Sequence, residues 1–261
     1  MGDSRTNVRL TTPVDRSAEF RSGGRRLAHL TRITPRRFTA STGTPVRGIV
    51  VGMHRVVDLG VLYFGTPVVL ISTRNPDGTA NVAPMSSAWW LGDQCMLGMG
   101  TGSQTSRNMA RERECVLNLP SSGLVGAVDR LALLTGCPIM TPHKIEKGYR
   151  YEPDKFTAAG LTQLPADLVA APRVAECPIQ LECEVLATEP FGIDTGALAH
   201  TVRVLRAHVA EELIIPGTAH IDPVGWDPLI MKFCEFFGNG AQLHPSRLAT
   251  AWQIPSAATS H

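Results

Sequence analysis

The stretch Thr66–Pro120 decides the fold, and it reads TPVVLISTRNPDGTANVAPMSSAWWLGDQCMLGMGTGSQTSRNMARERECVLNLP. Its first part predicts a β-hairpin. Val68–Thr73 is rich in β-branched and apolar residues, which favours a strand. Asn75–Gly78 combines a proline with a glycine that can take positive φ, which is typical of a turn. Ala80–Ala83 returns as the partner strand, which ends before Pro84 because proline cannot donate to the ladder.

Two further extended segments and a helix follow the hairpin. Ser86–Trp90 continues in extended form, and Cys95–Met99 is a short apolar strand. The segment Thr105–Arg113 predicts a helix that has either Thr105 or Ser103 as its N-cap.

The loop Gly98–Thr105, between the last strand and the helix, carries the pattern of an anion site. Its glycines let backbone N–H groups converge on an anion, and the start of a helix attracts phosphate. Arg107 adds positive charge, and Asn108 either steadies the turn or contacts the phosphate. Glycine-rich loops before helices are also common as plain connections. The hydroxyl donors of the predicted phosphate site are Thr101, Ser103 and Thr105.

A dinucleotide-binding Rossmann motif is the competing interpretation of the same loop. Gly98, Gly100 and Gly102 do not fit G-x-G-x-x-G, because Ser103 stands where the pattern continues. The next strand, Cys115–Leu119, is not followed by the acidic residue that binds a ribose. We therefore reject this interpretation.

Two long strands are predicted in the second half of the chain. Cys177–Ala187 alternates apolar and polar residues, which predicts a half-buried antiparallel strand with Glu182 and Glu184 on its solvated face. In His200–Val209 the apolar phase slips at Val204–Leu205, which indicates a β-bulge. Helices are predicted from the spacing or end signals of four segments: Gly123–Thr135, His143–Tyr149, Asp154–Gly160 and Leu229–Phe237.

The composition is that of a globular protein with one large domain or two small ones. Apolar residues make up 43% of the 261 residues, and the net charge is +2, which gives no indication of nucleic-acid or membrane-surface binding. No apolar run approaches the roughly 20 residues of a membrane span. The six cysteines show no C-x-x-C pair and the histidines no H-x-H or H-x-x-x-H spacing, so we expect a reducing cytoplasm and no metal site.

The first part of the chain differs from the rest. Residues 1 to about 50 contain ten arginines against Asp3, Asp15 and Glu19, with little periodicity. We predict a disordered basic extension over residues 1–52 and a single domain over residues 53–255. There are three alternatives for residues 1–52. They could be an organelle transit peptide, an arm that binds nucleic acid, or a stretch that does not belong to a shorter natural protein beginning near Met53.

The order of several motifs resembles the flavin reductase-like family, which has an FMN-binding split β-barrel. The motifs are P-V-V-L-I-S-T, D-G-T-A-N-V-A-P-M-S-S, T-S-R-N, V-L-N-L-P, D-K-F-T-A-A-G-L and V-A-A-P-R-V-A-E-C-P-I-Q-L-E-C-E-V, followed by the strand His200–Val209. The resemblance covers roughly Tyr63–Phe237. It implies a mainly β fold: a split antiparallel β-barrel of Greek-key character with helical insertions.

The resemblance also implies a cofactor site for FMN. A lysine near residue 144 can reach the cofactor, so Lys144 is the candidate and Lys147 its rival, and a histidine of the late strand lies near the flavin, with His200 as the candidate and His208 as the fallback. The segment Asn81–Trp89 would lie along the flavin ring. The implied contacts are Asn81, Met85, Ser86, Ser87, Ala88, Trp89, Thr101, Ser103, Thr105, Asn108, Lys144 and His200.

The activity implied by the resemblance is transfer of hydride from NAD(P)H to FMN. Such a transfer needs no acid or base side chain, so we expect no catalytic residues beyond the cofactor contacts. The family implies a homodimer, and a partner monooxygenase could use the reduced flavin. Three alternatives remain: a flavoredoxin-like electron carrier without NAD(P)H oxidase activity, an FMN-dependent oxidase or oxygenase, and a split-barrel binding protein that has lost its flavin.

Overall fold

The computed structural model describes residues 54–238, 240–244 and 247. Its internal contacts divide the chain into two units, residues 1–56 and 57–261, and the elements below all belong to the second unit. The predicted basic extension, residues 1–52, lies outside the described residues, together with the alternatives for its role.

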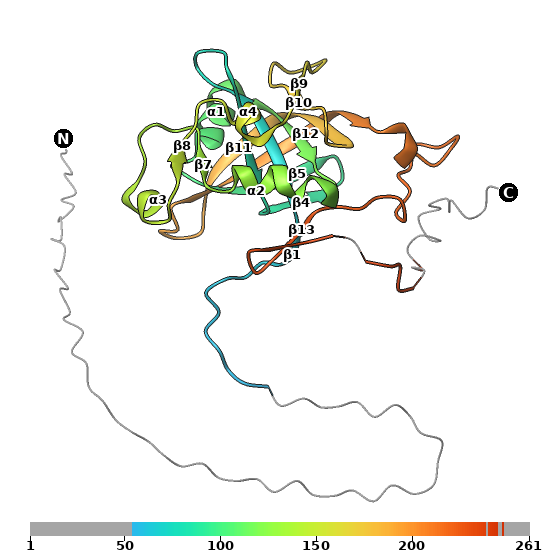
Figure 1. Cartoon of the computed structure of the whole chain (residues 1–261), viewed down its shortest axis with the longest axis horizontal. Coiled ribbons are helices and arrows are strands. Elements are labelled where there is room, and N and C mark those ends of the chain that lie inside the picture. The colour runs from blue at the N-terminus through green and yellow to red at the C-terminus, as the bar shows by residue number, and fades with distance from the viewer. Residues whose placement is uncertain (1–53, 239, 245–246, 248–261) are drawn as a thin grey trace, which may run out of the picture. The chain divides into compact units, whose positions relative to one another are not determined.

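The main sheet consists of seven antiparallel strands (Figure 1). They are β2 (Val69–Arg74), β3 (Ala80–Met85), β4 (Ala88–Leu91), β5 (Gln94–Gly100), β6 (Glu114–Leu119), β11 (Ile179–Phe191) and β12 (Ala197–Val209). Their order is β3-β2-β6-β11-β12-β5-β4. The two edge strands β3 and β4 are consecutive in the chain and are separated by Ser86 and Ser87 alone. The ends of the two edges therefore meet at this joint, and the sheet curls into a barrel that is split between them.

Strand β2 shows why the hairpin sequence is continuously apolar rather than alternating. Val69 and Ile71 point into the barrel, where they pack with residues of β5, β6, β11 and β12. Leu70, together with Val68 directly before the strand, points outward and packs beneath two helices. Because both faces of β2 are covered, both parities of its sequence are apolar.

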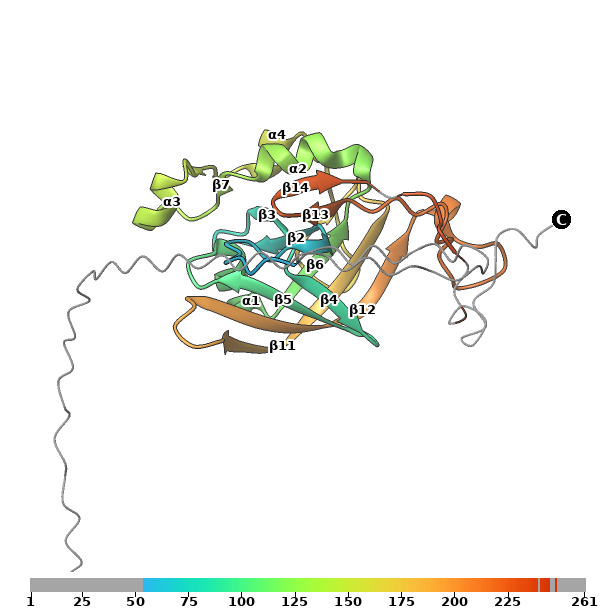
Figure 2. The same ribbon diagram turned by 90° about the horizontal axis from the view of Figure 1, so that it is seen from below.

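The helices are short and lie at the ends and one side of the barrel. They are α1 (Gln104–Glu112), α2 (Val125–Leu131), α3 (Pro142–Glu146) and α4 (Lys155–Ala159), with 3₁₀ turns η1 (Ser122–Leu124) and η2 (Glu211–Leu213). Figure 2 shows α2 and α4 together on one side and the long β11–β12 hairpin on the opposite side. Phe156 of α4 and Leu131 of α2 are fully buried in the cluster that covers the outer face of β2.

Three small sheets complete the described part of the chain. The first contains β1 (Phe64–Pro67), β13 (Ile230–Lys232) and β14 (Glu235–Phe237). The others pair β7 (Leu134–Thr135) with β8 (Arg150–Tyr151), and β9 (Gln163–Leu164) with β10 (Arg173–Val174). Among the described residues, no helix has the length and apolarity needed to cross a membrane.

Two helix predictions are wrong in whole or in part. Leu229–Phe237 is not a helix but the hairpin of β13 and β14, with Phe233 and Cys234 in the left-handed region at φ 49° and 68°. Pairing with β1 stabilises extended backbone there, whatever the apolar spacing. The helix predicted over Gly123–Thr135 ends at Leu131, because Leu134 and Thr135 pair with β8.

The two long strands contain one confirmed and one wrong prediction. Val204 pairs with Cys183 while Arg206 pairs with Glu182, so Leu205 is the extra residue of the predicted bulge. Glu182 was expected on a solvated face, but its side chain is fully buried. The segment that follows β9 covers this part of β11, and its backbone supplies hydrogen bonds to the carboxylate.

Candidate functional site

The start of α1 presents hydroxyl groups and backbone donors in one place. Ser103 is the N-cap, with extended backbone, and its Oγ accepts a hydrogen bond from the Ser106 N–H at 3.4 Å. This decides between the two N-caps that the sequence allowed. Thr105 lies in the first turn and is 2% exposed, and Thr101 is exposed and directly follows the preceding strand β5. The helix has nine residues, so its dipole adds positive potential at this end.

A cavity of about 380 Å³ opens at this helix start. Its walls come from the end of β3, the loop before α1, the end of α2 and the segment from Leu134 to Lys155. Thr101, Ser103 and Thr105 all line it, as the sequence predicted for a common anion site. Apolar walls stand opposite the hydroxyls, formed by Ala83, Pro84, Met85, Leu131 and Leu134.

Two lysines line the first cavity, and the described residues that line it include no acid. The Lys144 Nζ donates to the Gly102 carbonyl at 3.4 Å and to Thr135 Oγ1 at 3.3 Å. Its rival Lys147 is exposed and does not line the cavity. The sequence-based choice of Lys144 therefore falls on the lysine that faces the cavity.

Lys155 is the second lysine, and it is 3% exposed. Among the described residues its ammonium group has no hydrogen bond or ion pair. Burial, and to a smaller extent the charge of Lys144, lower the pKa of Lys155 from 10.5 to about 8. A buried cation without a partner is costly to the free protein, and an anion in the cavity would compensate it.

Lys155 is not among the site residues predicted from the sequence, although it lies in the family motif D-K-F-T. The signal was its place in the first turn of a short helix, directly after the N-cap Asp154. Lys155 shares the buried face of α4 with Phe156 and Ala159. A lysine on the apolar face of a helix is an exception that indicates a function.

Asn81 lies beneath the helix start and not on the cavity surface. Its Nδ2 donates to Thr73 Oγ1 and to Thr105 Oγ1, both at 3.0 Å, while its buried Oδ1 has no partner among the described residues. A Cβ on Gly136 would stand 2.7 Å from that Oδ1, so a larger residue at this position would have to displace the Asn81 amide. Asn81 therefore orients the Thr105 hydroxyl, whose hydrogen remains available toward the cavity.

Asn108 is also fully buried and is saturated by the protein itself. Its Nδ2 donates to Thr73 Oγ1 at 3.0 Å and to Asn75 Oδ1 at 2.9 Å. Its Oδ1 accepts from Gln104 Nε2 at 2.9 Å and from Arg111 at 3.2 Å. Of the two roles that the sequence left open, this geometry supports steadying the turn.

His200 is buried behind α1 and lines neither of the two cavities described here. Its Nε2 is 2.9 Å from Ser106 Oγ and its Nδ1 is 2.9 Å from Thr188 Oγ1, so the ring bridges α1 and β11. Burial lowers the pKa of His200. His200 therefore holds α1 against the barrel and does not lie on the cavity surface.

A second cavity of about 580 Å³ adjoins the first, and Met85, Met99 and Gly100 line both. Ser86, Ser87, Ala88 and Trp89 line the second cavity and not the first. The space exists because β5 and β12 carry small residues on this side. Gly98 pairs with Ala199, and Gly100 pairs with Ala197.

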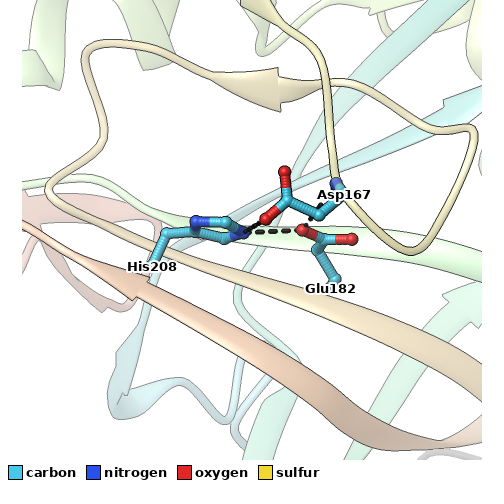
Figure 3. A group of neighbouring side chains, drawn as sticks. All are labelled: Asp167, Glu182 and His208. Carbon is cyan, nitrogen blue, oxygen red and sulfur yellow. Dashed lines mark hydrogen bonds and ion pairs between the residues drawn. The ribbon is translucent and has the colours of Figure 1, made fainter.

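A separate cluster of polar side chains joins the β11–β12 hairpin to the segment between β9 and β10 (Figure 3). Asp167, Glu182 and His208 place one ligand atom each within 4.8 Å of one another. Both Glu182 oxygens accept hydrogen bonds, from the N–H groups of residues 167–169 and from His208 at 2.6 Å. Arg206 pairs with Asp167 at 2.6 Å. The groups thus satisfy one another and anchor the segment around Asp167 on the hairpin.

These features agree with the comparisons to known proteins. The family model described as flavin reductase like domain matches residues 61–228, and the chain belongs to this family. The uncharacterized protein YdfE of Bacillus subtilis (strain 168) is 39% identical over 183 residues, which are 70% of this chain and 88% of that protein. The resemblance inferred from the motifs is confirmed.

Solved structures of the same fold support the predicted architecture. The flavoredoxin of Desulfovibrio vulgaris (Miyazaki F) superposes with a TM-score of 0.62 at 20% identity, covering 76% of this chain and all of that one. Nitrilotriacetate monooxygenase component B from Bacillus cereus gives a TM-score of 0.57 at 22% identity, over 70% of this chain and 88% of that one. The prediction of a mainly β split barrel with helical insertions is confirmed. Family membership assigns the chain a flavin-related redox function.

Proposed function

We propose that the first cavity binds FMN and that NAD(P)H reduces this flavin. The observation that carries the proposal is Lys155, a buried ammonium group without a partner among the described residues. It faces the same cavity as Lys144 and the hydroxyl-rich start of α1. A phosphate monoester carries about two negative charges at neutral pH, which two lysines and a helix start match.

Each part of the cavity has a task in this proposal. Thr101, Ser103 and Thr105 would donate to the phosphate oxygens, with Thr105 oriented by Asn81. The apolar wall of residues 83–85 would support one face of the isoalloxazine ring. FMN, when bound, supplies a ring that accepts hydride. The chain's contribution is to fix the phosphate and to leave one ring face accessible.

The other residues inferred from the sequence keep distinct roles. Asn108 and His200 hold α1 in place and would act on FMN only through the helix. Ser86, Ser87, Ala88 and Trp89 would border the open side of the ring, where the second cavity begins. Met85 lines both cavities and would lie at the boundary.

Association and partners extend the proposal. We propose a homodimer through the free edge of β4, where Leu91 is 76% exposed. A structure with a similar fold is named as component B of a monooxygenase. Delivery of reduced flavin to a partner monooxygenase is therefore part of the proposal, and it would take place in the cytoplasm.

The test is an absorbance spectrum of the purified protein with FMN, recorded anaerobically before and after addition of NADH and then NADPH. Loss of the oxidised flavin bands with either nucleotide supports the reductase. Tight FMN that neither nucleotide reduces would favour an electron carrier of the flavoredoxin kind. A protein that binds neither FMN nor riboflavin would overturn the proposal.

A further inference from the structure

The second cavity differs from the first in that no charged side chain lines it among the described residues. Its lining consists of aromatic, methionine, leucine, alanine and glycine residues together with a few hydroxyl groups. Trp89 and Phe191 stand at its exposed rim, each more than half exposed. A charged ligand would gain no ion pair here and would lose hydration, so the lining favours an uncharged ligand with an apolar, planar body.

Hydroxyl groups in the second cavity have hydrogens to donate. Thr66 Oγ1 is buried and has no hydrogen-bond partner in the described part of the chain. Tyr63 OH lies 3.3 Å from Ser87 Oγ, and whichever of the two accepts keeps its own hydrogen free. Buried hydroxyls are normally satisfied, so the Thr66 hydrogen indicates a ligand that carries a hydrogen-bond acceptor, and the half-buried pair of Tyr63 and Ser87 offers such a ligand a second donor.

We propose that the second cavity binds a neutral planar quinone, which serves as an electron acceptor next to the flavin. The two carbonyl oxygens of a quinone suit Thr66 and the pair of Tyr63 and Ser87, and its ring suits Trp89 and Met99. This inference rests on the proposed function for its electron supply. NAD(P)H loses a hydride, and the quinone gains that pair of electrons with one proton from the nucleotide and one from solvent, which gives the hydroquinone and NAD(P)⁺.

The position of the cavity supports this pairing of sites. Because Met85, Met99 and Gly100 line both cavities, a ring lying against them is in reach of both. The difference in charge between the two cavities then determines which ligand each of them favours. A phosphorylated molecule is held where Lys144 and Lys155 stand, and a neutral molecule fits where no cation is present.

The experiment measures menadione binding to the full chain without nucleotide, by calorimetry and by quenching of tryptophan fluorescence, with FMN present and absent. Thr66→Val keeps the shape and removes the donor, and we expect it to weaken menadione binding about three- to tenfold. Thr162→Val, at an exposed threonine that lines neither cavity, is the matched control and should leave menadione binding unchanged. Ala199→Leu fills the space and should abolish binding, while naphthoquinone sulfonate should bind at least about tenfold more weakly than menadione.

The outcomes separate this inference from the proposed function. Menadione binding that is sensitive to Thr66→Val supports the quinone site even if no nucleotide reduces the flavin, a result that would sink only the reductase. Equal binding to the wild type, Thr66→Val and Ala199→Leu would overturn the quinone site, whatever the flavin does. Sedimentation that shows a dimer broken by Ala199→Leu, with no menadione binding by either protein, would also overturn it and would identify the cavity as a contact between two copies.

Discussion

The two cavities meet at three shared residues, Met85, Met99 and Gly100, yet their chemistry is opposite. The first is lined by Lys144, Lys155 and the hydroxyls at the start of α1, and the second by uncharged side chains of β4, β5 and β12. The difference follows from the elements that build them. Helix starts and inserted loops bring donors and cations, whereas the face of a sheet presents apolar and small side chains.

Two adjoining cavities of one barrel can therefore differ in the charge of the ligand that each of them favours. Both cavities flank the joint at Ser86–Ser87, where the chain passes from β3 to β4. A phosphate on one side and a neutral ring on the other would bring two ligands together without competition for one site. Variants that change one cavity and leave the other unchanged test whether the two cavities bind different ligands.

The largest effect is expected from Lys155→Met. Removing the buried ammonium group should weaken FMN binding by about 2–3 kcal/mol, because a charge-assisted contact to the phosphate is lost. The FMN-free variant should be more stable than the wild type, since it no longer buries an unpaired charge. Calorimetry for FMN and urea unfolding measure the two changes. Lys147→Met, at an exposed lysine outside the cavity, is the control, and weaker FMN binding by that variant as well would contradict the assignment.

The pH dependence of protein stability gives a second test of the buried charge on Lys155. With a folded-state pKa near 8 and an ordinary value of 10.5, the unfolded chain holds more protons between these limits. The stability cost of Lys155 is therefore complete below pH 8 and disappears as the pH rises toward 10.5. The stability difference between Lys155→Met and the wild type should shrink over this window, and FMN affinity of the wild type should fall as Lys155 loses its proton. A difference that stays constant across the window would show that Lys155 keeps an ordinary pKa.

Thr105→Ala should have the next largest effect on FMN binding, a loss of about 2 kcal/mol. The hydroxyl donates toward the phosphate, so riboflavin, which lacks the phosphate, should bind almost as before. Thr105→Ser keeps the donor and should retain most of the affinity. Equal losses for FMN and riboflavin would mean that Thr105 matters only through its bond to Asn81.

His200→Ala should act on stability more than on the cavity. Loss of the bridge between Ser106 and Thr188 should lower the free energy of unfolding by about 1–2 kcal/mol, while FMN binding changes less. Because burial lowers the pKa of His200, the unfolded chain takes up the proton first, and wild-type stability should fall as the pH drops below about 6.5. Urea unfolding between pH 5 and 7 should show a smaller fall for the variant. An unchanged pH slope would contradict the buried, neutral ring.

The smallest effect on FMN is expected from Trp89→Ala. Trp89 lines the second cavity and not the first, and it makes no contact with the proposed phosphate site, so FMN affinity should change by less than about twofold. Menadione binding should weaken clearly in the same variant. A large loss of FMN affinity would contradict the assignment of different ligands to the two cavities, because it would place the flavin ring itself inside the second cavity.

Much of the fold could be predicted because it depends on local signals. The hairpin at Asn75–Gly78 and the bulge at Val204–Leu205 follow from turn chemistry and the phase of alternation, and capping narrowed the helix start to Ser103 or Thr105. The segment Leu229–Phe237 could not be predicted in the same way. A short apolar run suits a helix or a strand, and pairing with β1, distant in sequence, decides between them.

For the site, the chemistry at the start of α1 and the family of the chain could be predicted from the residues alone. Which of these residues line the cavity and which lie beneath its surface depends on the packing of distant elements. Asn81, Asn108 and His200 are drawn into hydrogen bonds with Thr73, Ser106 and Thr188, while Lys155 is turned into the cavity by the packing of α4. Polarity is a property of each residue, but burial depends on elements that are distant in the chain. Only the folded protein therefore distinguishes residues that would contact the ligand from residues that hold those contacts in place.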